Sequence, residues 1–197
     1  MTRRARTPML IVLEGLDGCG KSTVARLVAQ RLGARLCKTP DSSLDGARAQ
    51  IEETFGARSP ALTLFYASTV LAASDDARAE LERGRTVVLD RYWMSTLAYA
   101  RASGRDIDLE GVEPRLLPAD LTVFLHANRL VRAERLGSRC QLSDHDLLSV
   151  NPAGEAALLA TYRALAAHRI AGRVLVLDST KESARQIARR VCEEVRS

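Results

Sequence analysis

Five short apolar runs divide the chain, at residues 9–14, 34–38, 86–90, 121–125 and 174–177. Continuous apolar runs of this length are typical of strands that are buried on both faces of a sheet. Between the runs, apolar residues recur at helical spacing, as at Val24, Leu27, Val28 and Leu32. This spacing predicts helices over residues 22–32, 44–55, 61–83, 94–101, 128–136, 153–168 and 182–195.

Strands that alternate with helices predict an α/β fold, because parallel strands need crossover helices between them. We expect three layers, with a five-stranded parallel sheet and helices on both of its faces. A single domain is expected over residues 9–197, after a basic tail over residues 1–8. Residues 137–152 lack both periodicities and are expected to be mobile. Ligands of such sheets bind beyond the carboxyl ends of the strands, so the residues there are candidates for chemistry.

The composition narrows the class of protein. Hydrophobic residues make up 46% of the chain, enough for a sizeable core. No apolar run reaches the roughly 18 residues of a membrane span and no secretory signal stands at the N-terminus, so we expect a cytoplasmic protein without a membrane partner. Four cysteines lie far apart without a CxxC pair, which favours reduced thiols. The net charge of +5 comes without a basic stripe, so no nucleic-acid partner is expected.

A glycine-rich stretch directly follows the first predicted strand. It fits the pattern GxxxxGK[ST] in full, with Gly15, Leu16, Asp17, Gly18, Cys19, Gly20, Lys21, Ser22 and Thr23. The glycines allow backbone N–H groups to converge on phosphate oxygens at the positive end of the following helix. Lys21 would reach the outer phosphates of ATP, and the hydroxyl of Ser22 would bind Mg²⁺. The motif therefore predicts a P-loop NTPase fold that uses ATP and Mg²⁺.

Asp90 and Arg91 end the third predicted strand. Charges at the end of a buried strand are costly unless they are used. We expect Asp90 to share Mg²⁺ with Ser22, and Arg91 to hold a second phosphate. Aromatic residues gather in two segments, as Phe65, Tyr66, Tyr92, Trp93 and Tyr99. Such rings would stack on a base or fill space beside a sugar.

Taken together, these stretches resemble the thymidylate kinase family. The resemblance rests on the P-loop, on its spacing to Asp90-Arg91-Tyr92 and Ser95-Thr96, and on residues 118–125 followed by Arg135. It covers nearly the whole chain and implies a nucleoside monophosphate kinase that uses ATP. Residues 36–40, Phe65-Tyr66 and residues 90–93 look more like the mitochondrial UMP-CMP kinase branch of that family.

The resemblance implies roles at an acceptor site. Asp17 would face the 3′-hydroxyl of the acceptor, Phe65 would stack on its base, and Arg91 would bind its phosphate. Tyr92 would crowd the 2′ position of the sugar and favour deoxyribose. The further residues implied at this site are Lys38, Pro40, Ser95 and Tyr99.

The resemblance also implies a lid over residues 137–152 and a homodimer through helices such as residues 61–73. Gly18 stands where some members carry an arginine in the P-loop. The arginine that stabilises the transition state is therefore expected from the lid side, as Arg135 or Arg139. With Lys21, Asp90 and Arg91, these two arginines make up the implied catalytic set.

Three positions depart from the thymidylate pattern. Lys38 replaces an arginine on the acceptor side and cannot form a bidentate fork. Thr69 replaces the arginine that reads thymine, and Ala100 replaces a glutamine. The residues of phosphoryl transfer are retained and those that read thymine are not. The expected acceptor is thus a pyrimidine nucleoside monophosphate, with dTMP, dUMP, dCMP, UMP and CMP open.

Two other functions are less favoured. A deoxynucleoside kinase needs a general base near the second strand, where the chain offers Lys38, Thr39 and Pro40 instead. A P-loop switch or nucleic-acid-driven ATPase needs a guanine-reading NKxD segment or a basic track, and neither is found. His126, His145 and His168 show no metal spacing and are expected as surface or cap residues. Residues 144–146 are expected to be solvated.

Overall fold

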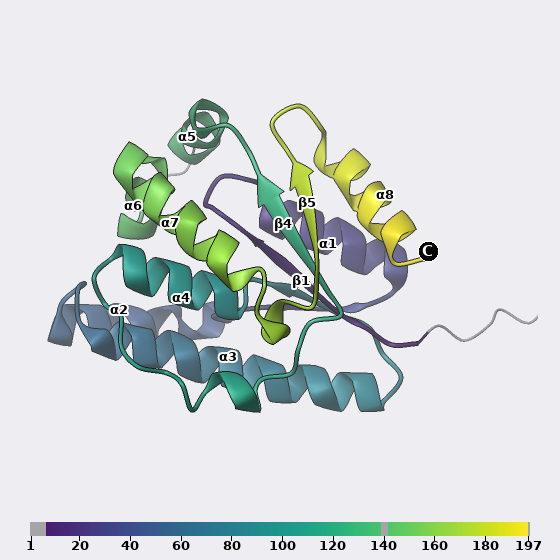
Figure 1. The fold of residues 1–197 in the computed structure, drawn as a ribbon, viewed down its shortest axis with the longest axis horizontal. Coiled ribbons are helices and arrows are strands. Elements are labelled where there is room, and N and C mark those ends of the chain that lie inside the picture. Colours follow the sequence, from purple (N-terminus) through teal and green to yellow (C-terminus); the bar gives the residue numbers. More distant parts are fainter. Residues whose placement is uncertain (1–6, 139–141, 197) are drawn as a thin grey trace, which may run out of the picture.

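The computed structural model describes residues 7–138 and 142–196. Its centre is a five-stranded parallel sheet with the order β2-β3-β1-β4-β5 (Figure 1). The strands are β1 (Leu10–Gly15), β2 (Arg35–Lys38), β3 (Val87–Asp90), β4 (Leu121–His126) and β5 (Arg173–Asp178). All five strands predicted from apolar runs are confirmed, and so is the α/β fold class.

Helices cover both faces of the sheet. The helices are α1 (Lys21–Leu32), α2 (Asp45–Phe55), α3 (Pro60–Glu82), α4 (Trp93–Ala102), α5 (Arg129–Gly137), α6 (Asp144–Val150), α7 (Pro152–Leu165) and α8 (Ala184–Glu194). Short 3₁₀ turns lie at Ser42–Leu44, Glu113–Arg115 and Arg169–Ala171. None of the described helices combines the length and the apolar character needed to cross a bilayer.

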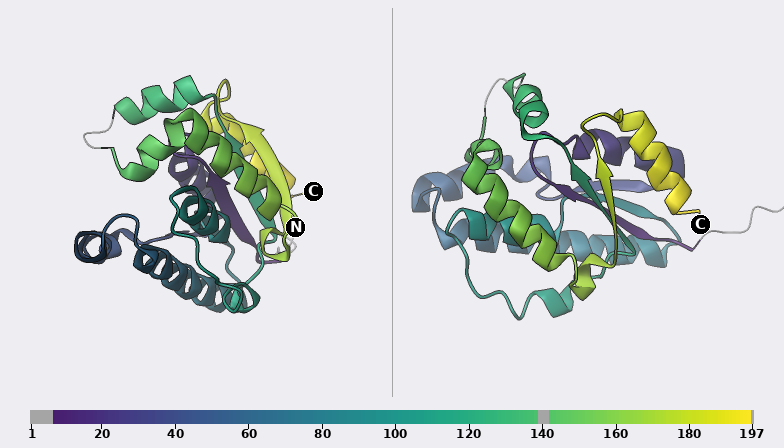
Figure 2. Two further views of the ribbon diagram at one scale, coloured as in Figure 1. Left: turned by 60° about the vertical axis from the view of Figure 1, so that its left-hand side comes forward. Right: turned by 45° about the horizontal axis from the view of Figure 1, so that its top comes forward.

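The side chains of β1 divide the core into two layers, because neighbours along a strand point to opposite faces. Leu10 and Val12 pack with residues of α3, α4 and α7, whereas Ile11 and Leu13 pack with residues of α1 and α8. Figure 2 shows α1 and α8 together on one side of the sheet and the other three helices on the opposite side. The predicted three-layer arrangement is therefore confirmed.

One predicted loop contains a helix. Residues 142–152 were expected to lack regular structure, but α6 occupies Asp144–Val150. Ser143 caps this helix by accepting from the backbone N–H of Asp146, and the Asp146 carboxylate accepts from the backbone N–H of Ser143. This reciprocal capping stabilises a helix too short for its periodicity to be recognised.

The register of the sheet aligns the ends of three strands. Asp90 of β3 lies beside Leu13 of β1 on one side and beside Lys38 of β2 on the other. The segments after β1, β2 and β3 therefore leave the sheet at one edge. This edge is where ligands bind in open parallel sheets.

Candidate functional site

The phosphate loop joins β1, the central strand, to α1. Gly18 has φ +80°, and a Cβ there would lie 2.7 Å from the backbone oxygen of Arg132 in α5. No larger residue fits without displacing the loop from α5. The close approach of α5 thus explains why Gly18 stands where some family members carry an arginine.

Lys21 is buried against its own loop. Its Nζ donates to the carbonyl oxygens of Gly15 and Leu16, both at 2.8 Å. The next two residues, Ser22 and Thr23, are exposed in the first turn of α1. The loop thus holds one buried ammonium and presents two hydroxyls to solvent at the positive end of a helix.

Asp17 lies between two positively charged side chains, Arg91 and Lys21. Its carboxylate pairs with the Arg91 guanidinium, accepts from the Tyr99 hydroxyl at 2.6 Å, and lies 4.0 Å from Lys21 Nζ. Burial raises the pKa of Asp17, but the charges of Arg91 and Lys21 outweigh it and hold the pKa well below its usual range. Asp17 is therefore ionised at neutral pH and joins the phosphate loop to the end of β3.

Arg91 adopts an unusual backbone conformation, with φ +71°. Its N–H donates to Leu13 at 3.0 Å, and its carbonyl oxygen accepts from the Thr39 hydroxyl at 2.7 Å. Its guanidinium lies 5.4 Å from the centre of the Tyr99 ring. A left-handed conformation at a non-glycine residue is found mostly where function requires a fixed direction, and here strands β1 and β2 hold it in place.

Glu14 supports this turn, and the sequence analysis assigned it no role. Its buried carboxylate accepts from the backbone N–H groups of Tyr92 (3.0 Å) and Ser95 (3.2 Å) and from the Ser95 hydroxyl. Burial raises the pKa of Glu14, and the hydrogen bonds from Ser95 oppose that rise. Glu14 therefore caps α4 from a neighbouring strand. The sequence signal was a single carboxylate in an otherwise apolar strand.

Asp90 is suited to a metal ion. It is buried, and its Oδ1 has no hydrogen-bond partner among the described residues. Those residues contain no group of three metal-ligating acidic, histidine or cysteine side chains. Mg²⁺ in phosphoryl transfer needs only one or two protein ligands, because phosphates and water supply the rest. The unpaired Asp90 oxygen and the exposed Ser22 hydroxyl fit that requirement.

A cavity of about 220 Å³ opens beside Asp17 and Arg91. Seven predicted acceptor-site residues line it, from three separate segments of the chain: Asp17, Lys38, Pro40, Arg91, Tyr92, Ser95 and Tyr99. The ring of Tyr92 is buried, its hydroxyl donates to Leu117 at 3.1 Å, and burial raises the pKa of Tyr92 to about 12. The tertiary structure thus brings these seven residues together, as the sequence analysis expected.

Phe65 does not line this cavity. The residues of α3 that do so are Thr63, Tyr66 and Thr69, which lie three apart and share one helix face. Phe65 packs edge-on against Tyr66, with ring centres 5.4 Å apart. The aromatic ring that α3 contributes to the cavity is therefore that of Tyr66, one position from the predicted residue.

His145 was expected at the surface, and the structure corrects this. Its ring lies 4.8 Å from the Tyr99 ring and 5.8 Å from the Tyr66 ring, and its Nε2 lies 2.8 Å from Arg105. Burial and the neighbouring Arg105 charge lower the pKa of His145 to about 4. Further cavity residues to which the sequence analysis gave no role in the site include His145, Arg105, Arg48 and Thr63.

Arg135 lies beside the phosphate loop. Its guanidinium donates to the carbonyl oxygens of Gly18 at 3.3 Å and Ser179 at 2.8 Å. It does not line the acceptor cavity. The other candidate, Arg139, lies outside the described residues. The neighbouring Arg132 is buried and donates to Ser149 at 2.8 Å, which ties α5 to α6.

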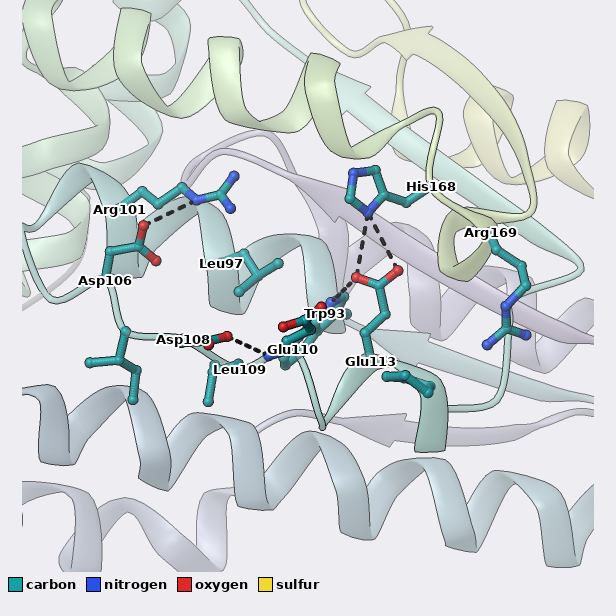
Figure 3. A pocket seen from close by; sticks show the side chains of 12 residues that line it. Trp93, Leu97, Arg101, Asp106, Asp108, Leu109, Glu110, Glu113, His168 and Arg169 are labelled. Atoms are coloured by element: carbon teal, nitrogen blue, oxygen red, sulfur yellow. Dashed lines mark hydrogen bonds and ion pairs between the residues drawn. The ribbon is translucent and has the colours of Figure 1, made fainter.

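A second cavity of about 710 Å³ lies on another face of α4 (Figure 3). Its polar groups pair with one another. The Trp93 indole donates to Glu113 at 3.0 Å, and Glu113 lies 3.4 Å from His168. Trp93, one of the rings expected beside a base or sugar, lines this cavity and not the acceptor cavity. None of the residues implied for catalysis or for the acceptor site lines it. The acceptor cavity beside the phosphate loop is therefore the candidate active site.

A phosphate loop and an arginine-lined cavity that meet at one sheet edge define a P-loop phosphotransferase. The family model described as thymidylate kinase matches residues 13–191. The chain belongs to the thymidylate kinase family and is an ATP-dependent nucleoside monophosphate kinase.

Known relatives agree with this assignment. A probable thymidylate kinase of Archaeoglobus fulgidus is 32% identical over 71% of this chain and 75% of its own length. A thymidylate kinase of Leifsonia xyli subsp. xyli is 33% identical over 89% of both chains. The solved thymidylate kinase of Candida albicans has a TM-score of 0.70 at 21% identity, over 96% of this chain and 92% of its own, and shows the same fold.

The lowered pKa of His145 predicts a loss of stability in mild acid. The unfolded chain binds a proton near pH 6.5 and the folded protein only near pH 4, so stability is lost as the pH falls through this interval. The free energy of unfolding should fall there by as much as about 3 kcal/mol. Urea titrations at several pH values measure it. The charged groups and rings that face His145 are Arg105, Asp17, Arg91, Arg48, Tyr66 and Tyr99.

The matched variants are His145→Gln and His126→Gln, the second at a side chain that is 45% exposed. Only the first should flatten the curve between pH 6.5 and 4, because Asp17 and Glu14 titrate equally in both. Parallel curves for His145→Gln and the original protein would contradict the assignment.

Proposed function

We propose that this protein transfers the γ-phosphoryl group of ATP to the 5′-phosphate of a pyrimidine nucleoside monophosphate such as dTMP. The observation that carries the proposal is the position of Arg91. Arg91 lies beside the phosphate loop, because its guanidinium pairs with the carboxylate of Asp17 in that loop. It also lines the acceptor cavity. A guanidinium there suits a second phosphate, which must lie end to end with the first for transfer.

The donor side consists of the phosphate loop and the residues around it. The loop amides and Lys21 would hold the outer phosphates, at the N-terminus of α1. Ser22 and the unpaired oxygen of Asp90 would hold Mg²⁺, which neutralises phosphate charge when bound. Arg135, already beside the Gly18 carbonyl, remains a candidate for the phosphoryl charge on this side.

The acceptor side consists of Arg91, Lys38 and the cavity behind them. An incoming phosphate would replace Asp17 as the partner of Arg91, and the freed Asp17 carboxylate would accept from a sugar hydroxyl. No covalent intermediate is required, since alignment and charge stabilisation account for phosphoryl transfer. Closing the cavity around both phosphates would exclude water and suppress ATP hydrolysis.

The carboxylates of the cavity argue against a free hydroxyl as the acceptor. Phosphorylation of a hydroxyl is helped by a general base, whose pKa should lie near the working pH. Asp17 has a strongly lowered pKa, and the Asp146 carboxylate accepts hydrogen bonds from Ser143. Neither carboxylate suits a general base, which favours a monophosphate acceptor over a nucleoside.

We also propose a cytoplasmic homodimer. Cys19 and Cys37 are free thiols, which suits a reducing compartment. Leu64 of α3 and Phe55 of α2 are large apolar side chains that are 55% and 61% exposed. Exposed apolar side chains that gather in a patch mark interfaces, and we propose that these two belong to one.

The subunit interface is tested by light scattering. Leu64→Glu should halve the mass in solution, because a buried unpaired carboxylate opposes association. Val176→Glu, at an equally exposed position on the edge strand β5, should leave the mass unchanged. A monomeric original protein would overturn the proposed dimer.

The transfer reaction is tested by ADP formation from ATP with a panel of acceptors: dTMP, dUMP, dCMP, CMP, UMP and AMP. Turnover should require a pyrimidine monophosphate, and Lys21→Ala should lower kcat by roughly 10²–10³-fold. Arg26→Ala, an exposed change on the same helix, should retain activity. ATP hydrolysis stimulated by DNA but by no monophosphate would contradict the function.

The second phosphate site is tested with Arg91→Ala. This variant should lower kcat/KM for the acceptor by roughly 10- to 100-fold, raising KM and lowering kcat together. The KM for ATP should stay unchanged, and Arg91→Lys should recover part of the loss. Arg189→Ala on α8, an exposed arginine, serves as the control. A change confined to the ATP parameters would place Arg91 on the donor side instead.

A further inference from the structure

The wall of the acceptor cavity that α3 forms offers few hydrogen-bond donors to a ligand. Its cavity-lining residues are Thr63, Tyr66 and Thr69. The Thr69 hydroxyl donates to the carbonyl oxygen of Tyr66 at 2.8 Å, and the Thr63 hydroxyl donates to that of Arg105 at 2.9 Å. Both threonine hydroxyl protons are thus committed to backbone oxygens. Of the three side chains, only Tyr66 keeps a hydroxyl for a ligand, so the rest of the lining matters for reading a base.

Arg105 supplies a donor from the loop after α4. The residue is 3% exposed and lines the cavity, and its Nε has no hydrogen-bond partner among the described residues. The ends of its guanidinium are occupied, by Ala57 at 3.4 Å and Ser103 at 3.3 Å. Buried N–H groups are almost always paired in folded proteins. Because Arg105 lines the acceptor cavity, a ligand there can complete the hydrogen bonding of this Nε–H.

His145 holds Arg105 in this position. Its Nε2 lies 2.8 Å from Nη2 of Arg105, and because guanidinium nitrogens only donate, Nε2 is the acceptor. The imidazole ring is in turn packed against the rings of Tyr66 and Tyr99. The guanidinium is therefore fixed before a ligand binds, which lowers the entropy cost of recognition.

Arg105 and Arg91 stand at opposite ends of α4. This helix begins two residues after Arg91 and ends three residues before Arg105, and its ten residues rise about 15 Å. Both arginines nevertheless line the same cavity. A nucleotide whose phosphate lies on Arg91 would direct its base away from the phosphate loop, toward Arg105 and Tyr66.

We infer that Arg105, positioned by His145, reads the acceptor base by donating its Nε–H to a carbonyl oxygen of the pyrimidine ring. The inference rests on the proposed function, since it assumes that the acceptor phosphate lies on Arg91. It assigns base recognition to the loop after α4 and to α6, beside Tyr66 of α3. The pairing requires a base with an exposed carbonyl oxygen, which dTMP, dUMP and dCMP all carry.

The experiment compares dTMP with its 2-thio and 4-thio analogues, because sulfur accepts hydrogen bonds weakly. In the original protein, one of the two substitutions should raise the acceptor KM about tenfold. The measured quantity is the ratio of the KM for the thio analogue to the KM for dTMP. In Arg105→Met this ratio should fall to about one, while KM for dTMP rises about tenfold and KM for ATP is unchanged. The two proteins and the two acceptors form a double-mutant cycle. The cycle measures the contact between Arg105 and the base separately from any effect of the substitution on folding.

Two further variants keep the test decisive. Arg105→Leu also removes every donor of the side chain, so it should lose the thio-analogue effect as well, and it replaces the methionine variant if that one does not fold. Arg101→Met, outside the cavity at the end of the same helix, should keep the ratio.

The outcomes separate this inference from the proposed function. Absence of phosphorylation of any monophosphate by the original protein refutes the proposed function. Phosphorylation with a ratio that Arg105→Met leaves unchanged refutes only the role of Arg105. If Arg105→Met lowers the melting temperature and leaves the ratio unchanged, Arg105 stabilises the fold and does not contact the base.

Discussion

The ion pair between the buried Asp17 and the partly buried Arg91 organises the site. It joins the phosphate loop after β1 to the turn after β3, and Tyr99 and Lys21 complete it. Burying two charges costs free energy that their attraction seldom repays in full. The pair therefore matters more for function than for stability: it keeps a guanidinium ready for a phosphate, which would take over the place of Asp17.

The backbone around Arg91 is held from both neighbouring strands. Leu13 of β1 and Thr39 after β2 bind its N–H and its carbonyl oxygen, and Glu14 caps the helix that follows. These contacts stabilise a left-handed conformation that costs about 1 kcal/mol or more at a non-glycine residue. The parallel register of the sheet thus determines the direction of a single side chain.

The two ends of the acceptor cavity are built differently. At the phosphate end, the charged residues follow directly on central strands and are contiguous with recognisable motifs. At the other end, the lining comes from α3, from the loop after α4 and from α6. Arg105 and His145, 40 residues apart, meet there through a hydrogen bond. This is also the part where the chain departs from the thymidylate pattern, at Thr69 and Ala100.

The amino-acid sequence by itself determined the five strands, the phosphate loop and the adjacent charges Asp90 and Arg91 at the end of β3. Each of these depends on residues that are neighbours in the chain, so apolar runs and fixed spacings reveal them. Only the tertiary structure decided that Tyr66 faces the cavity in place of Phe65, that Glu14 caps α4, and that α6 brings His145 to Arg105. These features depend on the rotation of a helix about its axis and on partners up to 81 residues away. Packing of the whole core sets such relations, and no local pattern encodes them.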